Sequence, residues 1–371
     1  MTRELHLDYP TGAVSSGHRK SPGFCRMCIN ALKWLPVLLI TTIVVWSYYA
    51  YVVQLCIFNI KGMLERIAYL IFYHIFFLMF LWSYWQTVFT NIGEVPSKFK
   101  VPPAVLDRLV KCDTDQQQRR ILEDFAKNLP LANTTEVGSV RYCDKCHHVK
   151  PDRAHHCSVC GKCVLKMDHH CPWVNNCVSF YNYKFFILFL GYSLLYCLYI
   201  GLTSLRYFIY FWRVRISGEL EGFGRFHILF LFFVALMFAI SLVSLFGYHC
   251  CLVYNNRTTL EAFRAPYFRT GEDKNGFNVG HCKNFQEVFG TKSKLWFLPV
   301  YTSLGDGIVF PVHPQHQASM YNSMGTTHGR SDDDENDSIT ENNAAEASFD
   351  SAILTDETMR INPPSDKTMN V

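Results

Sequence analysis

Charge is almost absent from four long stretches of this 371-residue chain. No Asp, Glu, Lys or Arg occurs in residues 34–58, 67–89, 185–205 or 226–253. A helix needs about 20 apolar residues to cross a bilayer, so each stretch is long enough to span a membrane. Four such runs are rare in the cores of soluble proteins, which disfavours the alternative of buried helices in a large soluble domain. The sequence predicts an α-helical membrane protein with four transmembrane helices.

Other absences exclude further classes of protein. The four stretches lack carboxylates and paired charges, which argues against a transporter or a channel. A net charge of only +4 gives no reason to expect nucleic acid as a partner. The first apolar run is too long for a secretory signal and lacks a small-residue cleavage site, so we expect it to remain as a span. Small secreted disulfide scaffolds are excluded as well, because they lack long apolar runs.

Cysteine is unevenly distributed. Seven of the 15 cysteines lie between residues 143 and 177. Their C-x2-C spacings, mixed with histidine, are typical of zinc ligands. Two sites of three cysteines and one histidine would use six of the seven, so one cysteine is left over. Spacing alone leaves open whether the two sites follow one another or interleave. Zinc needs reduced thiols, which predicts a cytosolic position for this segment.

The surplus cysteine is the candidate nucleophile. A zinc-bound thiolate has its charge neutralised, whereas a free thiol beside a base can attack an electrophile. Cys171 is the best choice because it follows one acid and two histidines, Asp168, His169 and His170. These residues can form a Cys-His-Asp relay, in which the acid orients the base. The alternative is that Cys171 is a ninth, spare zinc ligand.

A family resemblance rests on the same residues. Asp168-His169-His170-Cys171-Pro172-Trp173, in a cysteine-rich region between hydrophobic segments, resembles the DHHC family of protein S-acyltransferases (palmitoyltransferases). The patterns Cys-Pro-Trp-Val-x-Asn-Cys and His-His-Cys-x2-Cys are also typical of that family. The resemblance extends over about residues 34–307. It fails at 91–96, where Asn-Ile-Gly-Glu-Val-Pro stands in place of the family's Asp-Pro-Gly.

The resemblance implies two interleaved structural zinc ions. The two ligand sets are Cys143, Cys146, His156 and Cys163, and Cys157, Cys160, His170 and Cys177. His155 is the substitute ligand if the assignment is wrong by one position. If His170 binds zinc, His169 is the free base on the same side of an extended strand as Cys171, and Asp168 orients it.

Three residues after the fourth span are implied as support for the site. Thr259 and Glu261 belong to Thr-Thr-Leu-Glu, and Asn284 belongs to an aromatic-asparagine motif. The resemblance implies that Thr259 contacts the region of Asp168 and that Asn284 caps backbone carbonyls. Without the family, Thr-Thr-Leu-Glu is equally well explained as a helix N-terminus.

The implied reaction is transfer of a long-chain fatty acyl group, expected to be palmitoyl, from acyl-CoA to cysteines of membrane-associated proteins. Cys171 would carry the acyl-enzyme. The alternative is a membrane-anchored zinc scaffold, which needs no acid and base beside the surplus thiol. By resemblance, Trp173 lies near the acyl chain, and Ser47 and Tyr196 close the end of its cavity. Nearby basic residues either meet CoA phosphates or form a solvated face: Arg141, Lys150, Arg153 and Lys166.

The expected order of segments follows from the spans and from basic residues near them. It is a cytosolic N-terminal segment (1–33), two spans (34–89), a cytosolic linker and zinc domain of short hairpins (90–184), two spans (185–253), a cytosolic C-terminal segment (254–312) and a disordered acidic tail (313–371). Residues 104–128 have a helical pattern. His74 and His249, within spans, are expected to face other helices rather than bind a ligand.

The sequence says little about which membrane of the cell contains the protein. We expect a multi-pass protein with its active site on the cytosolic face of the Golgi or another endomembrane, with the plasma membrane as the alternative. The expected partners are fatty acyl-CoA, the lipid bilayer and cysteine-containing substrate proteins. Cys25 and Cys28 form a further C-x2-C beside the first span, which suits lipidation or an inert pair better than zinc.

Overall fold

A computed structural model describes residues 23–216 and 224–317. The predicted acidic tail therefore falls almost wholly outside the described residues, and so do the first 22 residues of the N-terminal segment. The side chain of Cys25 is not described either, so the interpretation of Cys25 with Cys28 also lies outside what the structure covers.

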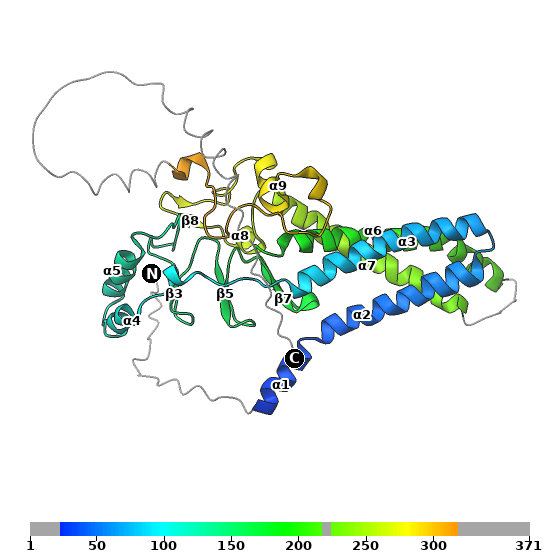
Figure 1. Ribbon diagram of the computed structural model, residues 1–371, viewed down its shortest axis with the longest axis horizontal. Helices are drawn as coiled ribbons and strands as arrows, with labels where there is room; N and C mark the ends of the chain where they lie inside the picture. The colour runs from blue at the N-terminus through cyan, green and yellow to red at the C-terminus, as the bar shows by residue number, and fades with distance from the viewer. Residues whose placement is uncertain (1–22, 217–223, 318–371) are drawn as a thin grey trace, which may run out of the picture. The chain divides into compact units, whose positions relative to one another are not determined.

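Four long apolar helices lie side by side (Figure 1). The stretches long and apolar enough to cross a membrane are Asn30–Asn59, Met63–Phe89, Tyr183–Tyr210 and Phe226–Tyr254. They are built from α1 (Gly23–Leu32), α2 (Leu35–Tyr48) and the π-helix η1 (Tyr49–Asn59), then α3 (Met63–Phe89), α6 (Tyr183–Ile216) and α7 (Gly224–Tyr254). The predicted helical membrane protein with four spans is confirmed.

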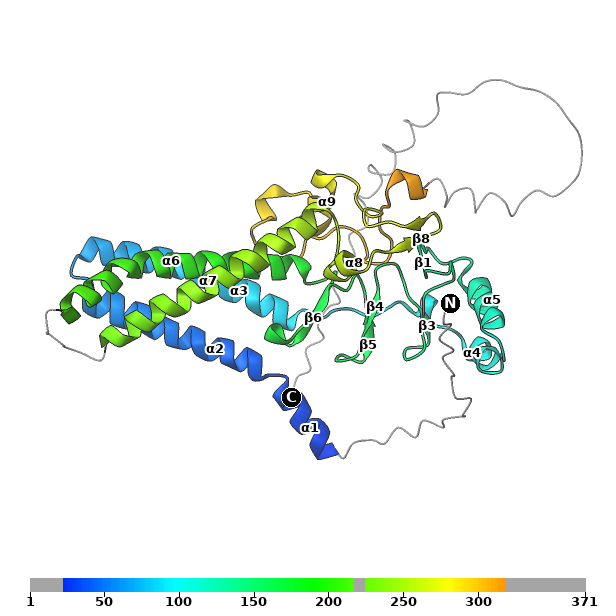
Figure 2. The same ribbon diagram turned by 180° about the vertical axis from the view of Figure 1, so that it is seen from behind.

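Three short antiparallel hairpins form the cysteine-rich region between the second and third spans (Figure 2). They pair β2 (Tyr142–Cys143) with β3 (His148–Val149), β4 (His155–Cys157) with β5 (Lys162–Val164), and β6 (His169–Cys171) with β7 (Asn176–Val178). Each chain reversal uses one residue with positive φ: His147 at 55°, Gly161 at 69° and Asn175 at 47°. Two-stranded pieces this short are not stable alone, so other contacts must hold them in place.

The linker and the segment after α7 surround these hairpins. The remaining elements are η2 (Ser97–Phe99), α4 (Pro103–Val110), α5 (Asp115–Ala126), β1 (Asn133–Thr134), η3 (Pro172–Val174), α8 (Thr259–Phe263), β8 (Tyr267–Phe268), β9 (Gly271–Glu272), α9 (His281–Phe289) and η4 (Ser293–Leu295). The helical pattern of 104–128 is two helices rather than one, because Thr114 starts a new helix by accepting a hydrogen bond from the backbone N–H of Gln117. Strand β1 pairs with β8, which ties the linker to the C-terminal segment.

The third hairpin is docked onto the end of α3 by asparagine side chains. The amide nitrogen of Asn176 lies 3.2, 3.2 and 3.0 Å from the backbone oxygens of Thr87, Val88 and Thr90. These carbonyls belong to the last turn of α3, where the helix itself supplies no donors. Fully buried Asn182 donates to the carbonyls of Thr87 and Cys177 as well. The end of the second span is thus fixed to the strand that follows Cys171.

We predict that Asn176→Ala destabilises the protein by about 1–3 kcal/mol, because it removes the donor that three helix-end carbonyls share. Gln116→Ala, which removes an exposed amide from α5, is the control and should have little effect. Denaturant unfolding of the detergent-solubilised protein measures both. Equal stability of the two variants would show that water replaces the Asn176 amide without cost.

Candidate active site and metal clusters

Two groups of three cysteines and one histidine come together in the hairpins, and they are the two sets predicted above. In the first group, Nδ1 of His156 lies 3.6, 3.2 and 3.9 Å from the sulfurs of Cys143, Cys146 and Cys163. In the second group, Nδ1 of His170 lies 3.7, 3.5 and 3.5 Å from the sulfurs of Cys157, Cys160 and Cys177. The arrangement is interleaved, and His155 belongs to neither group.

These separations fit one tetrahedral zinc ion in each group. Zinc bonds of about 2.3 Å to sulfur and about 2.0 Å to nitrogen place neighbouring ligand atoms about 3.5–3.8 Å apart. The measured distances of 3.2–3.9 Å lie around that value. Both clusters can therefore hold zinc, and each would tie two adjacent hairpins together.

The interleaving follows from a repeat of 14 residues. The first strand of each hairpin ends at a cysteine, namely Cys143, Cys157 or Cys171. In all three hairpins this cysteine pairs with the residue five positions later, which begins the second strand. The turn of one hairpin supplies two sulfurs, and the paired strands of the next hairpin supply a histidine and a cysteine that lie opposite each other, as His156 and Cys163 do.

The third hairpin is the exception, and it contains Cys171. Val174 stands where the other two turns have their second cysteine, and it is fully buried. Helix α6 begins soon after β7, and within residues 23–216 and 224–317 no further hairpin supplies another histidine and cysteine. Cys171 therefore belongs to neither metal-ligand group. It is 6% exposed and lies in a hydrophobic cluster with Phe80, Tyr84 and Phe186 at the end of the helices.

Asp168 and His169 form a tight pair beside this thiol. Nδ1 of His169 lies 2.6 Å from Oδ2 of Asp168. Thr259 donates to the same carboxylate from its backbone N–H and from its hydroxyl, both at 2.8 Å. Burial raises the pKa of Asp168, but the hydrogen bonds from His169 and Thr259 hold it below its usual value. Burial lowers the pKa of His169, yet its hydrogen bonds with Asp168 and Cys171 outweigh this and raise it to about 9.

The Asp168–His169 pair is a hydrogen bond rather than a third metal site. Together with His249, these side chains place their donor atoms within 4.8 Å of one another, as metal ligands would. However, the 2.6 Å between Asp168 and His169 is shorter than any ligand separation in the two zinc clusters. A short charge-assisted hydrogen bond explains that distance directly. A pair of this kind can accept and return a proton.

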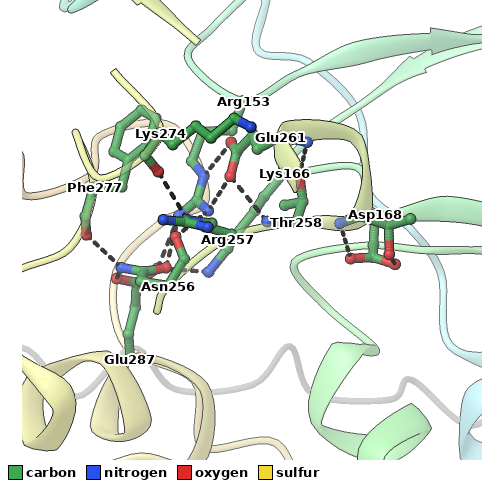
Figure 3. A network of polar contacts seen from close by, with 11 residues as sticks. Arg153, Lys166, Asp168, Asn256, Arg257, Thr258, Glu261, Lys274, Phe277 and Glu287 are labelled. Atoms are coloured by element: carbon green, nitrogen blue, oxygen red, sulfur yellow. Dashed lines mark hydrogen bonds and ion pairs between the residues drawn. The ribbon is translucent and has the colours of Figure 1, made fainter. Parts of the chain in front are cut away.

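The contact from Thr259 depends on a buried network of charges (Figure 3). Arg153, fully buried and with φ of 60°, donates to both carboxylate oxygens of Glu261 at 2.8 and 2.6 Å. Glu261 also accepts the backbone N–H of Thr258, and Thr258 in turn caps Glu261, which forms the first turn of α8. The guanidinium therefore fixes the turn from which Thr259 reaches Asp168. Both interpretations of Thr-Thr-Leu-Glu hold, since it is a helix N-terminus that also contacts Asp168.

A second cation completes the network. Lys166 lies 2.6 Å from Glu287, which also accepts from Asn256 at 2.7 Å. Burial alone would raise the pKa of Glu287, but Lys166 and Arg153 hold it below its usual value. Asn284, three residues before Glu287, donates to the carbonyl of Tyr254 at the end of α7 and accepts from the N–H of Val279. Asn284 thus caps a backbone carbonyl as expected.

The network corrects one expectation about CoA. Arg153 and Lys166 are 1% and 7% exposed and are paired with carboxylates, so neither forms a solvated face or is open to a phosphate. The guanidinium of Arg141 donates to the carbonyl of Ala154. Basic residue type and position in the chain suggested a role at the surface, whereas Arg153 and Lys166 are structural. Lys150 and the half-buried Arg141 are the remaining candidates of the four.

Two of the three expected acyl-binding residues meet inside the helices. Ser47 and Tyr196 are buried, and their oxygens lie 2.9 Å apart. Tyr73, which the sequence analysis did not single out, lies 2.8 Å from the same Tyr196 hydroxyl. Trp173 is elsewhere, 53% exposed in η3, with its carbonyl accepting from Tyr84.

An apolar groove of about 560 Å³ lies between α2 and α3. It extends from Tyr84 and Trp85 to Tyr48 and His74. Its residues Phe77 and Phe80 pack against the ring of Tyr196, at centroid distances of 6.0 and 5.6 Å. Ser47 and Tyr196 do not line this groove. They lie next to it, since Tyr196 packs against Phe77 and Phe80 and bonds to Ser47.

Spans, hairpins and site together define a helical membrane protein in which Cys171 and the Asp168–His169 pair lie beside two clusters that can hold metal, at the end of the transmembrane helices. The chain belongs to the DHHC palmitoyltransferase family. Residues 136–265 match the family model described as DHHC palmitoyltransferase.

Relatives cover most of the chain. It is 52% identical to palmitoyltransferase ZDHHC15 of Xenopus laevis over 291 residues, 78% of this chain and 85% of the relative. It is 52% identical to human palmitoyltransferase ZDHHC2 over 302 residues, 81% of this chain and 80% of the relative. Identity to palmitoyltransferase ZDHHC20-A of Danio rerio is 54% over 286 residues, covering 77% and 79%.

We predict that Arg153→Met costs about 3–5 kcal/mol of folding stability, because it leaves Glu261 buried without its cation and removes one of the two cations beside Glu287. Arg264→Met is the matched control. Its ion pair with Glu136 spans 3.8 Å between side chains that are 80% and 66% exposed, so its loss should change little. Denaturant midpoints in detergent measure both. Indistinguishable midpoints would mean that Arg153 does not hold the C-terminal segment in place.

Proposed function

We propose that this chain is a protein S-acyltransferase that moves a long-chain fatty acyl group, expected to be palmitoyl, from acyl-CoA to cysteines of membrane-associated proteins. The observation that carries the proposal is a thiol, Cys171, that belongs to neither metal cluster and lies beside the hydrogen-bonded Asp168–His169 pair. A zinc scaffold without catalysis would need neither that pair nor the two contacts from Thr259. Family membership supports the same reaction.

The first step is attack of the Cys171 sulfur on the thioester carbonyl of acyl-CoA. His169 holds the proton of the Cys171 thiol while the new carbon–sulfur bond forms, and Asp168 favours this imidazolium, in keeping with the raised pKa of His169. The bond to the CoA sulfur then breaks, and the CoA thiolate takes the proton from His169. This leaves a thioester on Cys171, free CoA and neutral His169.

The second step returns the enzyme to its starting state. A cysteine of the substrate protein gives its proton to His169 and attacks the Cys171 thioester. Cys171 leaves as the thiolate and recovers the proton from His169. Two zinc ions, held by the two Cys3His sets, would supply folding energy to the hairpins and take no part in proton transfer.

The acyl chain would lie among the helices while CoA remains in water. The groove between α2 and α3 is apolar, and its Phe80 and Tyr84 belong to the same hydrophobic cluster as Cys171. In our proposal, the hydrogen-bonded Ser47 and Tyr196 behind Phe77 and Phe80 limit how deep the chain reaches, and Trp173 covers it near the thiol. The helix lengths support a multi-pass membrane protein. We propose that the site faces the cytosol at the Golgi, another endomembrane or the plasma membrane.

Cysteine variants separate the proposed roles. Cys171→Ser should keep two zinc ions per chain and the fold but form no acyl-enzyme, because a hydroxyl beside His169 stays protonated near neutral pH. Cys157→Ser should lose zinc, stability and acylation together. His169→Ala should keep zinc and slow autoacylation by about a hundred- to ten-thousandfold. Zinc content per chain and hydroxylamine-sensitive labelling by palmitoyl-CoA measure these outcomes.

Cys112→Ser is the control for the cysteine variants, because Cys112 lies outside both metal groups and should change neither readout. Loss of a zinc ion from Cys171→Ser would make Cys171 a ligand. A hydroxylamine-sensitive acyl-enzyme in that variant would assign the chemistry to another cysteine.

Chain-length preference tests the proposed cavity end. Tyr196→Ala removes the ring that backs Phe77 and Phe80, so longer acyl chains should compete better. Ser47→Phe adds bulk at the same place and should favour shorter chains. Competition between acyl-CoAs of different length measures the shift, with Tyr210→Ala, an exposed tyrosine of α6, as control. Unchanged preference in both variants would place the limit elsewhere.

A further inference from the structure

His249 is a buried polar side chain that the catalytic scheme does not use. It lies in α7 and is 2% exposed. Its ring faces the ring of His169, with centroids 5.9 Å apart and planes inclined by 38°. One of its nitrogens lies within 4.8 Å of a carboxylate oxygen of Asp168 and a ring nitrogen of His169. His249 does face another helix, as expected, but it also borders the acid–base pair.

The position of the hydrogen on His249 follows from its partner. Nδ1 lies 3.2 Å from the hydroxyl of Tyr183, a buried residue at the start of α6. Within residues 23–216 and 224–317, no second hydrogen-bond partner is found for this hydroxyl. A buried hydroxyl needs an acceptor for its hydrogen, so Tyr183 donates to Nδ1. Neutral His249 then carries its hydrogen on Nε2, the nitrogen left to act on Asp168 and His169.

The ring of His169 is bounded on several sides. Asp168 binds its Nδ1 at 2.6 Å. Phe186 lies edge-on to both imidazoles, with centroids 5.3 Å from His169 and 5.0 Å from His249. The wall formed by Phe186 and His249 therefore limits how the ring of His169 can turn. Proton transfer requires Nε2 of His169 to stay beside the Cys171 sulfur. Small displacements of a catalytic group strongly lower the rate of the chemical step.

We propose that His249 is a positioning residue for the base in acyl transfer, an inference that rests on the proposed function. It holds the Asp168–His169 pair in the orientation that faces Cys171. The hydrogen on its Nε2 is the one available to the carboxylate of Asp168, and its ring packs on that of His169, so both members of the pair are restrained. His249 does not touch the reacting atoms. Its loss should therefore slow the chemical step and leave the affinity for acyl-CoA unchanged.

The test compares three variants of the purified full-length protein with palmitoyl-CoA as the acyl donor. His249→Phe keeps an aromatic ring but removes the donor, and should lower kcat of acyl-enzyme formation about ten- to hundredfold with KM unchanged. His249→Gln restores an N–H donor and should recover most of that loss. Tyr183→Phe removes the partner of His249 and should also lower kcat. Tyr248→Phe, at the neighbouring and 39% exposed position, is the control and should match the unmodified protein.

Several outcomes would overturn the inference. They are a normal kcat in His249→Phe, an equal loss in His249→Phe and His249→Gln, and a change confined to KM. If His249→Phe does not fold, as shown by loss of zinc, Tyr183→Phe decides, and a normal kcat in that variant also overturns the inference. Failure of the proposed function itself is distinct, because the unmodified protein would then form no hydroxylamine-sensitive acyl-enzyme.

Discussion

Two buried cations facing two buried carboxylates join the cysteine-rich hairpins to the segment that follows α7. Arg153 and Lys166 come from the connections between the hairpins, and Glu261 and Glu287 come from the C-terminal segment. Buried charges without partners are strongly unfavourable. Separating the two segments would therefore require all four charged side chains to become exposed to water. Because Glu261 also builds the first turn of α8, the same pairs set the place of Thr259 against Asp168. The orientation of the Asp168–His169 pair therefore depends on residues more than 90 positions away in sequence.

The transmembrane part of the fold could be predicted from the sequence because it rests on one local property. Uncharged stretches of sufficient length predict spans wherever they occur, and all four were found. The asparagine contacts that fix the third hairpin could not be predicted this way. Asn176 and the last turn of α3 are about 90 residues apart, and an asparagine in a loop has many equivalent roles until its neighbours are known. The break at Thr114 has a different cause, because a single N-cap threonine is a local signal with a weak sequence pattern.

For the site, spacing and resemblance predicted the groups that meet in the two clusters and in the Asp168–His169 pair. What sequence could not predict was the burial of Arg153 and Lys166, since a basic residue type alone suggests the surface. Their positive φ values of 60° and 40° mark tightly constrained turns, but φ cannot be read from residue type. Tyr73 was missed, and His249 was expected only to face other helices. A tyrosine or histidine in an apolar span usually just packs against its neighbours. One signal was available in the sequence, namely the 14-residue recurrence of Cys143, Cys157 and Cys171.

That recurrence has a consequence at the ends of the series. Each hairpin completes the metal-ligand group of the hairpin before it, so a row of three such units forms two groups. The first and the last unit each have one half of a group left without a partner. At the first unit the unused half has no ligands, since Tyr142 and Val149 stand where later units have histidine and cysteine. At the last unit one sulfur is present: Cys171 has the position of a metal-binding cysteine but belongs to neither group. The nucleophile that we propose is therefore the unpaired sulfur at the open edge of the array, buried like its counterparts, and it needs no other architecture.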